Sequence, residues 1–181
     1  MKICINGGHY PHLDSGALGS HITEAEYTME LMESVASYLE AAGCEVLRVQ
    51  ENDLAEITSA ANDWGADLFV SLHCNAANKR ARGTESYAYT GSEEGRHLAA
   101  CIQSQLTDSI DTVDRGVKEA SFYVLRYTDC PAALIEVAFI DNEEDEQLLL
   151  SHKDQIARAI ARGVTDAVVS MNQANKAQMN G

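Results

Sequence analysis

The chain has 181 residues, 45% of them hydrophobic, which is enough for one domain with a substantial apolar core. Its formal net charge is -15, with 13 Lys and Arg against 28 Asp and Glu, so the basic surface that a phosphate backbone requires is missing and we expect no nucleic-acid partner. No run of about 18 apolar residues occurs and the first residues do not resemble a secretory signal, so we expect no membrane span and synthesis as a soluble cytoplasmic protein.

Three short segments rich in apolar and β-branched residues are typical of buried strands. They cover residues 2–6, 44–49 and 67–72. Between them, residues 24–42 and 55–64 carry apolar side chains every three or four positions, which predicts two helices. Thr23 and Glu26 have the spacing of a capping box, so the first helix is expected to begin within a residue of Glu24.

The second half of the chain continues the alternation of strands and helices. We expect strands at residues 84–89, 122–126 and 133–139, and helices at residues 94–106, 142–150 and 153–170. The polar stretch 107–121 predicts a loop, and the domain is expected to cover residues 1–170, followed by a polar, disordered tail at 171–181. This pattern predicts a single α/β domain with a central twisted, mostly parallel sheet and helices on both of its faces.

The five cysteines stand singly along the chain, at positions 4, 44, 74, 101 and 130. Their odd number does not suit a closed set of disulfides, and none of them has CxxC zinc spacing. We therefore interpret them as small thiols of a protein made in a reducing compartment.

Four reactive side chains fall where ligands collect in such sheets, outside the carboxyl ends of the strands. His9 follows the first strand, His73 ends the strand VSLH, Glu24 opens a helix, and Glu136 lies in the apolar strand ALIEV. Two imidazoles and a carboxylate form the ligand set of many hydrolytic zinc sites, which leave the fourth position to water. A buried carboxylate such as that of Glu136 is costly without a cation or a catalytic task.

Several of these residue types also have ordinary structural explanations. A histidine at a strand end is often only hydrogen-bonded, and a Glu at a helix start complements the helix dipole. Glu26 is the alternative to Glu24, because helix boundaries read from sequence are uncertain by a few residues. His12 and His21 could compete as ligands but are interpreted as loop residues. The acidic run 141–146 is interpreted as a solvated helix start rather than a calcium loop.

The motifs appear in a fixed order along the chain. They are Gly8-His9, the helix from Glu24 to Gly43, residues 66–76, residues 83–87, Arg115-Gly116-Val117, Val124-Leu125-Arg126 and residues 131–142. Together, over residues 2–168, they resemble the zinc-dependent N-acetylmuramoyl-L-alanine amidases of bacterial wall hydrolases and phage endolysins. The stretches 71–76 and 134–142 are highly specific in combination.

The resemblance implies a function and a set of roles. His9, Glu24 and His73 inherit the role of Zn²⁺ ligands, and Glu136 that of catalytic base and acid. The substrate implied is peptidoglycan, cut at the amide between N-acetylmuramic acid and L-alanine. Because the chain begins directly with the catalytic domain and shows no wall-binding repeat, a phage or prophage endolysin is the expected role.

The chain departs from the family pattern at a few positions. Where many relatives have Lys and Asn after the ligand Glu, this chain has Ala25 and Thr28, and Gln50-Glu51 replaces a frequent Thr-Arg pair. These positions lie outside the proposed metal ligands, so they concern how the substrate is bound and local packing rather than the reaction.

Two other functions remain as alternatives. A zinc metallocarboxypeptidase acting on stem peptides could use the same ligands. A non-catalytic module could cradle a phosphate at Gly7-Gly8, although the GxGxxG spacing is missing.

Overall fold

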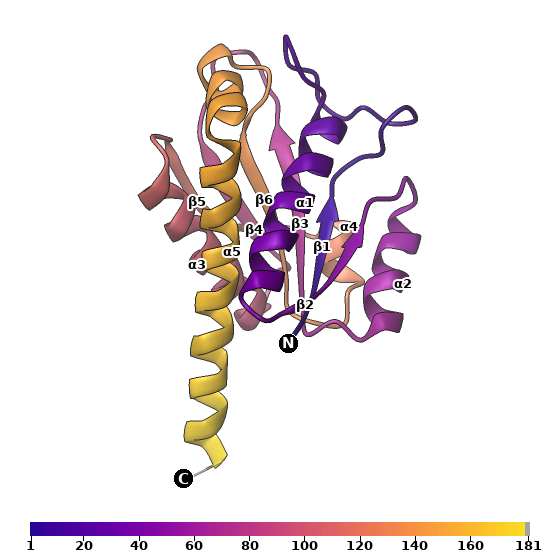
Figure 1. The fold of residues 1–181 in the computed structure, drawn as a ribbon, viewed down its shortest axis with the longest axis vertical. Coiled ribbons are helices and arrows are strands. Elements are labelled where there is room, and N and C mark those ends of the chain that lie inside the picture. Colours follow the sequence, from indigo (N-terminus) through magenta and orange to yellow (C-terminus); the bar gives the residue numbers. More distant parts are fainter. Residues whose placement is uncertain (180–181) are drawn as a thin grey trace.

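A six-stranded sheet forms the centre of the molecule (Figure 1). The computed structural model describes the backbone of residues 1–179 and the side chains of residues 1–173. The strands are β1 (Lys2–Gly7), β2 (Glu45–Val49), β3 (Leu68–Asn75), β4 (Thr84–Ala88), β5 (Asp114–Glu119) and β6 (Ala132–Phe139), in the spatial order β2-β1-β3-β6-β4-β5. Only β4 and β6 pair in the antiparallel sense. The expected single α/β domain with a mostly parallel sheet is confirmed.

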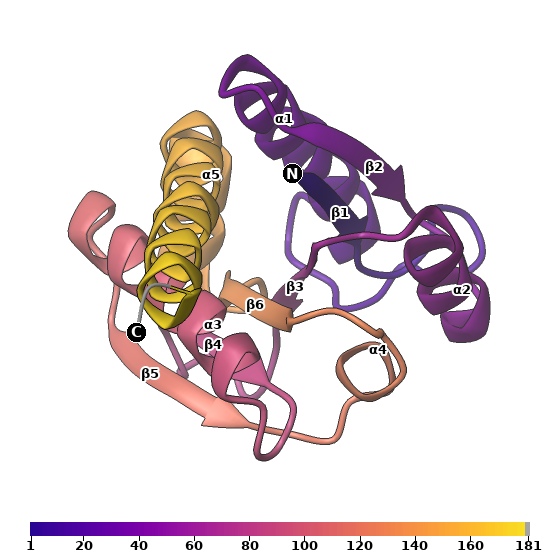
Figure 2. The same cartoon turned by 90° about the horizontal axis from the view of Figure 1, so that it is seen from below.

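Helices cover both faces of the sheet, as Figure 2 shows from below. They are α1 (Glu24–Ala41), α2 (Leu54–Trp64), α3 (Glu93–Ser109), α4 (Tyr123–Arg126) and α5 (Glu143–Met179). The larger apolar core joins α1, α3 and α5 to one face, and a smaller core joins α2 and α4 to the other. Of the helices described, none combines the length and the apolar character needed to cross a bilayer.

Thr23 caps the start of α1 as predicted, and Glu26 pairs with its hydroxyl rather than with its backbone N–H. The Thr23 hydroxyl accepts the backbone N–H of Glu26 and donates to the Glu26 carboxylate. This reciprocal pair makes Glu24 the first helical residue and turns its side chain inward, where it is 3% exposed. A local sequence signal therefore fixes a residue of the site.

The loop predicted for residues 107–121 is wrong. Residues 107–109 belong to α3, and Asp114–Glu119 form β5 at the sheet edge. Gly116 has a φ of 77°, and the pairing of β4 with β5 shifts register around it. This β-bulge breaks the alternation of side chains by which a strand is recognised in sequence.

The strand predicted for residues 122–126 is also wrong, because Tyr123–Arg126 form a single helical turn, α4. Val124 and Leu125 are both buried against the smaller core. Successive side chains of a strand point to opposite faces, whereas a helical turn can bury two neighbours against one surface. Tertiary packing thus decides the conformation of this short apolar stretch.

The two helices predicted at the end of the chain are joined into α5, with a kink at His152. Where we expected a polar tail, the backbone of residues 171–179 continues the helix, and residues 180 and 181 lie outside the described residues. The stretch 171–179 contains neither Gly nor Pro and is rich in good helix formers. Figure 1 shows this end of α5 extending past the sheet.

The acidic start of α5 is only partly the solvated surface that we expected. Asp145 is fully buried and accepts the backbone N–H groups of Gly83 and Phe139, at 2.8 Å and 2.9 Å. Glu146 is 3% exposed and accepts the backbone N–H of His21. These carboxylates tie loops on both sides of the site to α5, a long-range role that the sequence pattern does not reveal.

Candidate active site

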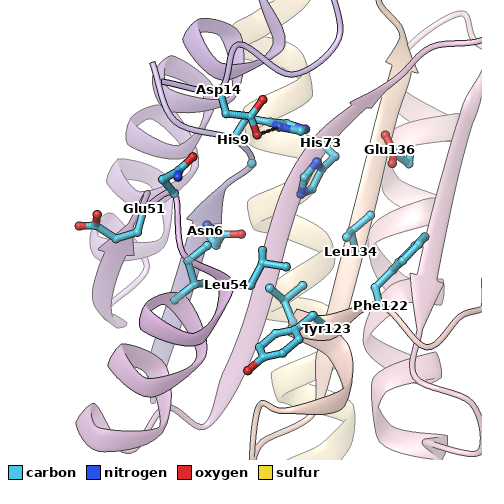
Figure 3. Close-up of a pocket in the computed structure, with 14 residues that line it drawn as sticks. Asn6, His9, Asp14, Glu51, Leu54, His73, Phe122, Tyr123, Leu134 and Glu136 are labelled. Carbon is cyan, nitrogen blue, oxygen red and sulfur yellow. Dashed lines mark hydrogen bonds and ion pairs between the residues drawn. The ribbon is translucent and has the colours of Figure 1, made fainter. Parts of the chain in front are cut away.

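Three side chains predicted as metal ligands meet at the carboxyl ends of β1 and β3. His9 follows β1, His73 lies near the end of β3, and Glu24 is the first residue of α1. One ligand atom from each lies within 4.8 Å of the other two. Figure 3 shows His9 and His73 pointing toward one another at the top of a cavity. The structure thus brings together residues that are 64 positions apart in sequence, from His9 to His73.

Four donors hold the Glu24 carboxylate in place. His9 Nε2 lies 3.1 Å from Oε2 and His73 Nδ1 lies 2.9 Å from Oε1. The backbone N–H groups of Ala17 and Cys74 donate to the same two oxygens, at 2.8 Å and 3.0 Å. Burial opposes ionisation of Glu24, but the hydrogen bonds from the two histidines hold its pKa well below the ordinary value. The cluster therefore contains a fixed negative charge.

The donor set and its spacing fit a zinc ion. Zinc binds histidine nitrogen and carboxylate oxygen at about 2.0–2.2 Å, so neighbouring ligand atoms of a tetrahedral site lie about 3.3 Å apart. The separations between Glu24 and the imidazoles, each to a different carboxylate oxygen, are 3.1 Å and 2.9 Å. With one ligand atom from each residue, the three lie within 4.8 Å of one another, so His9, Glu24 and His73 can surround such an ion if they move closer together.

Asp14, which was not predicted from the sequence as a site residue, orients His9. Its Oδ2 lies 2.7 Å from His9 Nδ1, the ring nitrogen that faces away from Glu24. Hydrogen bonding to Glu24, opposed by burial and assisted by Asp14, raises the pKa of His9 to about 9. The environment thus stabilises positive charge at this point, whether on an imidazolium or on a metal. A carboxylate behind a ligating histidine is a common arrangement in metal sites.

The two imidazoles pack directly against two glycines, where a side chain would clash with them. A Cβ on Gly8 would lie 2.4 Å from the His73 ring, and a Cβ on Gly16 would lie 2.5 Å from the His9 ring. Gly16 also has a φ of 63°, a conformation that favours glycine. Gly8 is therefore needed for close packing, which explains this glycine better than a phosphate cradle does. Its N–H already donates to Leu72 O at 2.8 Å.

The competing ligand candidates lie apart from the cluster. Glu26 is exposed and bonds to Thr23, so Glu24 and not Glu26 faces the histidines. His12 lies exposed in a turn. The His21 side chain is 74% exposed and pairs with Glu146.

Glu136 lies beside the cluster on β6, directly opposite His73 of β3 in the parallel register. Its Oε2 atom is buried and has no hydrogen-bond partner within the described part of the chain. Burial raises the pKa of Glu136 to about 7, assisted by the negative charges of Glu24 and Glu85 and opposed by His73. A half-buried carboxylate with one buried, unpaired oxygen is unfavourable for folding, so its presence beside the cluster points to a functional task.

A cavity of about 430 Å³ opens beside these residues (Figure 3). Its apolar wall comes from α2, α4 and β6 and consists of Leu54, Ile57, Phe122, Tyr123, Val124 and Leu134. Its histidine and acidic lining residues are His9, Asp14, Glu51, His73 and Glu136. The lining contains no Lys or Arg. The cavity thus suits an uncharged or cationic group better than an anion.

Comparisons with known proteins agree with this geometry. The family model described as N-acetylmuramoyl-L-alanine amidase matches residues 3–166. The chain is 39% identical to the uncharacterized protein YqiI of Bacillus subtilis, over 90% of this chain and 82% of that protein. It is 37% identical to the amidase LytC of Bacillus subtilis, over 89% of this chain but 34% of LytC. The structure resembles the amidase AmiC2 of Nostoc punctiforme with a TM-score of 0.86 and 30% identity, covering 93% of this chain and 97% of that one.

Proposed function

The chain belongs to the N-acetylmuramoyl-L-alanine amidase family, and from this premise we propose that it is a zinc-dependent hydrolase that cuts the amide between N-acetylmuramic acid and L-alanine in peptidoglycan. Membership supports amidase activity on the cell wall. One observation carries the finer proposal. A preformed cluster of two imidazoles and a carboxylate lies at a cavity beside the half-buried Glu136, whose buried Oε2 has no hydrogen-bond partner among the described residues.

His9, Glu24 and His73 are proposed to hold the zinc ion. Bound there, zinc would lower the pKa of a coordinated water toward ~7 and polarise the carbonyl to be attacked. Asp14 supports the site by fixing the ring orientation of His9 through Nδ1. Two N–H donors from Ala17 and Cys74 hold the Glu24 carboxylate so that both oxygens stay aimed at the imidazoles.

Glu136 is proposed to move the proton. It accepts a proton from the water that attacks the lactyl carbonyl and delivers it to the nitrogen of L-alanine, which then leaves as an amine. A carboxylate with a pKa near neutrality can do both, and Glu136 lies next to the cluster with a free oxygen. The apolar wall of the cavity limits water around the reacting groups.

Two finer expectations stay predictions. A metallocarboxypeptidase acting on stem peptides would use the same metal ligands, and only the bond that is cut separates it from the amidase. The endolysin role also stays a prediction, because relatives from Bacillus subtilis and Nostoc punctiforme contain the same catalytic domain.

Identification of the new amino termini in digested peptidoglycan tests the proposal. Purified sacculi are incubated with the zinc-loaded protein, labelled with fluorodinitrobenzene and hydrolysed. We expect labelled L-alanine and no new reducing sugar ends, because the proposed cleavage frees the amine of L-alanine. A glycosidase would release reducing ends, and a carboxypeptidase would free the amine of another residue. Either pattern, seen without labelled L-alanine, would rule out the assigned bond.

A further inference from the structure

A buried carboxylate beside Glu136 binds two cations. Glu85 of β4 is 3% exposed, and its Oε2 accepts hydrogen bonds from Arg115 Nε and Lys118 Nζ, both of β5. Its Oε1 accepts from Asn75 Nδ2 at 2.8 Å and from the Tyr87 hydroxyl at 2.7 Å. Burial opposes ionisation of Glu85, but the hydrogen bonds from Lys118, Tyr87 and Arg115 lower its pKa to about 2. Glu85 is thus a permanent anion within this group.

The register of the sheet places this group next to the active site. Glu85 lies directly opposite Glu136 in the antiparallel pairing of β4 with β6, and Glu136 lies opposite His73 in the pairing of β6 with β3. Residues opposite each other across a sheet present their side chains on the same face, with Cβ atoms about 5 Å apart. His73, Glu136 and Glu85 therefore form a row, and the two cations lie at its far end.

The bulge at Gly116 explains how both cations reach one carboxylate. Arg115 and Lys118 are three positions apart, so in a regular strand their side chains would point to opposite faces. The positive φ of Gly116 and the register shift around it change this alternation, so that both side chains turn to Glu85. Bulges commonly redirect side chains next to active sites.

The group has one positive charge more than it needs to neutralise Glu85. The Arg115 and Lys118 side chains are 34% and 39% exposed, whereas Glu85 is almost fully enclosed. Arg115 lies over the Phe139 ring at 4.8 Å, and Lys118 lies 5.8 Å from the centre of the Tyr87 ring. Two held, accessible cations beside the reaction site are notable in a chain with a net charge of -15.

The two sides of the His9-Glu24-His73 cluster thus differ in charge. The cavity side contains Asp14 and Glu51 but no Lys or Arg, and its wall is apolar. The β5 side, at the sheet edge in Figure 2, presents Arg115 and Lys118. The two halves of the proposed substrate differ in the same way. The muramoyl half is uncharged around its amide, whereas a stem peptide ends in a carboxylate.

We propose that Arg115 and Lys118 form a subsite for a carboxylate of the stem peptide that leaves with L-alanine. The inference rests on the proposed function, because it takes the leaving nitrogen to lie within reach of Glu136. A peptide spans about 3.5 Å per residue, so the carboxylate of the residue after L-alanine lies about 7 Å from the cleaved bond. Adjacent strands are about 4.8 Å apart, so β5 lies about 10 Å from β6. The cations reach back from β5 to Glu85 of the intervening β4, which brings their charged groups to about 5–10 Å from Glu136.

A purely structural role is the alternative, in which the pair only neutralises Glu85. One cation is sufficient for that task, and because Arg115 Nε donates to Glu85 independently of Lys118, we expect that bond to remain when Lys118 is replaced. The two explanations differ in substrate dependence. A stabilising role affects every substrate equally, whereas a carboxylate subsite affects only substrates that carry the carboxylate.

The test compares two soluble substrates and two lysine variants. The substrates are N-acetylmuramoyl-L-alanyl-D-glutamate and the same compound with both carboxyl groups amidated. The variants are Lys118→Met and the control Lys153→Met, which removes a lysine that pairs with Glu30 on α1. All are measured in the zinc-loaded full chain, together with thermal midpoints and with calorimetric binding of the dipeptides L-alanyl-D-glutamate and its diamide.

We expect the unmodified protein to prefer the carboxylate substrate about tenfold in kcat/KM, mainly through KM, as is typical of one charge-assisted hydrogen bond. Lys118→Met should lose that preference, because its kcat/KM should fall far more on the carboxylate substrate than on the diamide, and Lys153→Met should retain it. Dipeptide binding should show the same pattern. Equal rates on both substrates, or an equal loss on both in Lys118→Met, would overturn the subsite and leave the amidase assignment intact.

Failure of the amidase assignment gives a different result. If neither substrate is hydrolysed but L-alanyl-D-glutamate binds about tenfold more tightly than its diamide in a Lys118-dependent manner, the subsite stands and the reaction is wrong. If hydrolysis and selective binding are both absent, both proposals fall.

Discussion

Glu24→Ala is expected to lose most of its zinc, while Glu26→Ala retains a full equivalent. The two glutamates are two positions apart on α1, but Glu24 is buried against both histidines whereas Glu26 is exposed and bonds only to Thr23. Removing one of three protein ligands should weaken binding by at least about a hundredfold, more than the loss of an outer partner of a ligand does. Zinc content after gel filtration, followed by competition with a chromophoric chelator, measures the difference.

His9→Ala and His73→Ala should behave like Glu24→Ala, because each also provides one of the three ligand atoms. A variant that retains a full equivalent of zinc with unchanged affinity would not be a ligand. If Glu26→Ala lost zinc and Glu24→Ala did not, the geometry described for the start of α1 would be wrong.

Glu136→Gln is expected to bind zinc normally and to hydrolyse peptidoglycan at least about a hundredfold more slowly, the scale of a lost general acid and base. The glutamine has the shape of the glutamate but cannot exchange a proton. Because the substitution replaces a carboxylate whose ionisation burial disfavours with a neutral amide, the variant should unfold at an equal or higher temperature. Release of amino groups from sacculi, zinc content and a thermal melt together separate these effects.

Glu94→Gln, an exposed position on α3, serves as the matched control and should retain full activity. Near-normal turnover of Glu136→Gln would remove Glu136 from the mechanism. Loss of zinc from that variant would make Glu136 a metal ligand instead of the proton carrier.

The parts of the site that follow from local sequence rules were predictable. The capping box of Thr23 and Glu26 placed Glu24 at the first position of α1, and the apolar strand before His73 placed that histidine at the carboxyl end of the sheet. The apolar residues around Glu136 indicated a carboxylate that would be costly to keep unless it binds a cation or takes part in catalysis. Such signals depend only on neighbours in the chain and on the direction of parallel strands.

The parts that depend on backbone exceptions and long-range contacts were not predictable. Asp14 reaches His9 only because His9 itself has a φ of 61° in the loop after β1. A positive φ is uncommon for a residue other than glycine, so it could not be predicted from the sequence. Arg115 and Lys118 converge only because Gly116 forms a bulge, and the same bulge hid β5 inside a predicted loop. The residues that support or extend the site thus lie where local patterns fail.

The position of water attack tests the proposed function most directly. N-acetylmuramoyl-L-alanyl-D-glutamate is hydrolysed by the zinc-loaded protein in water enriched in heavy oxygen, and the masses of both products are measured. We expect the heavy oxygen in the lactyl carboxyl group of N-acetylmuramic acid and none in the released dipeptide, because the proposed attack is on the lactyl carbonyl. Heavy oxygen in a carboxyl group of the peptide, or at the anomeric carbon of the sugar, would contradict the amidase mechanism.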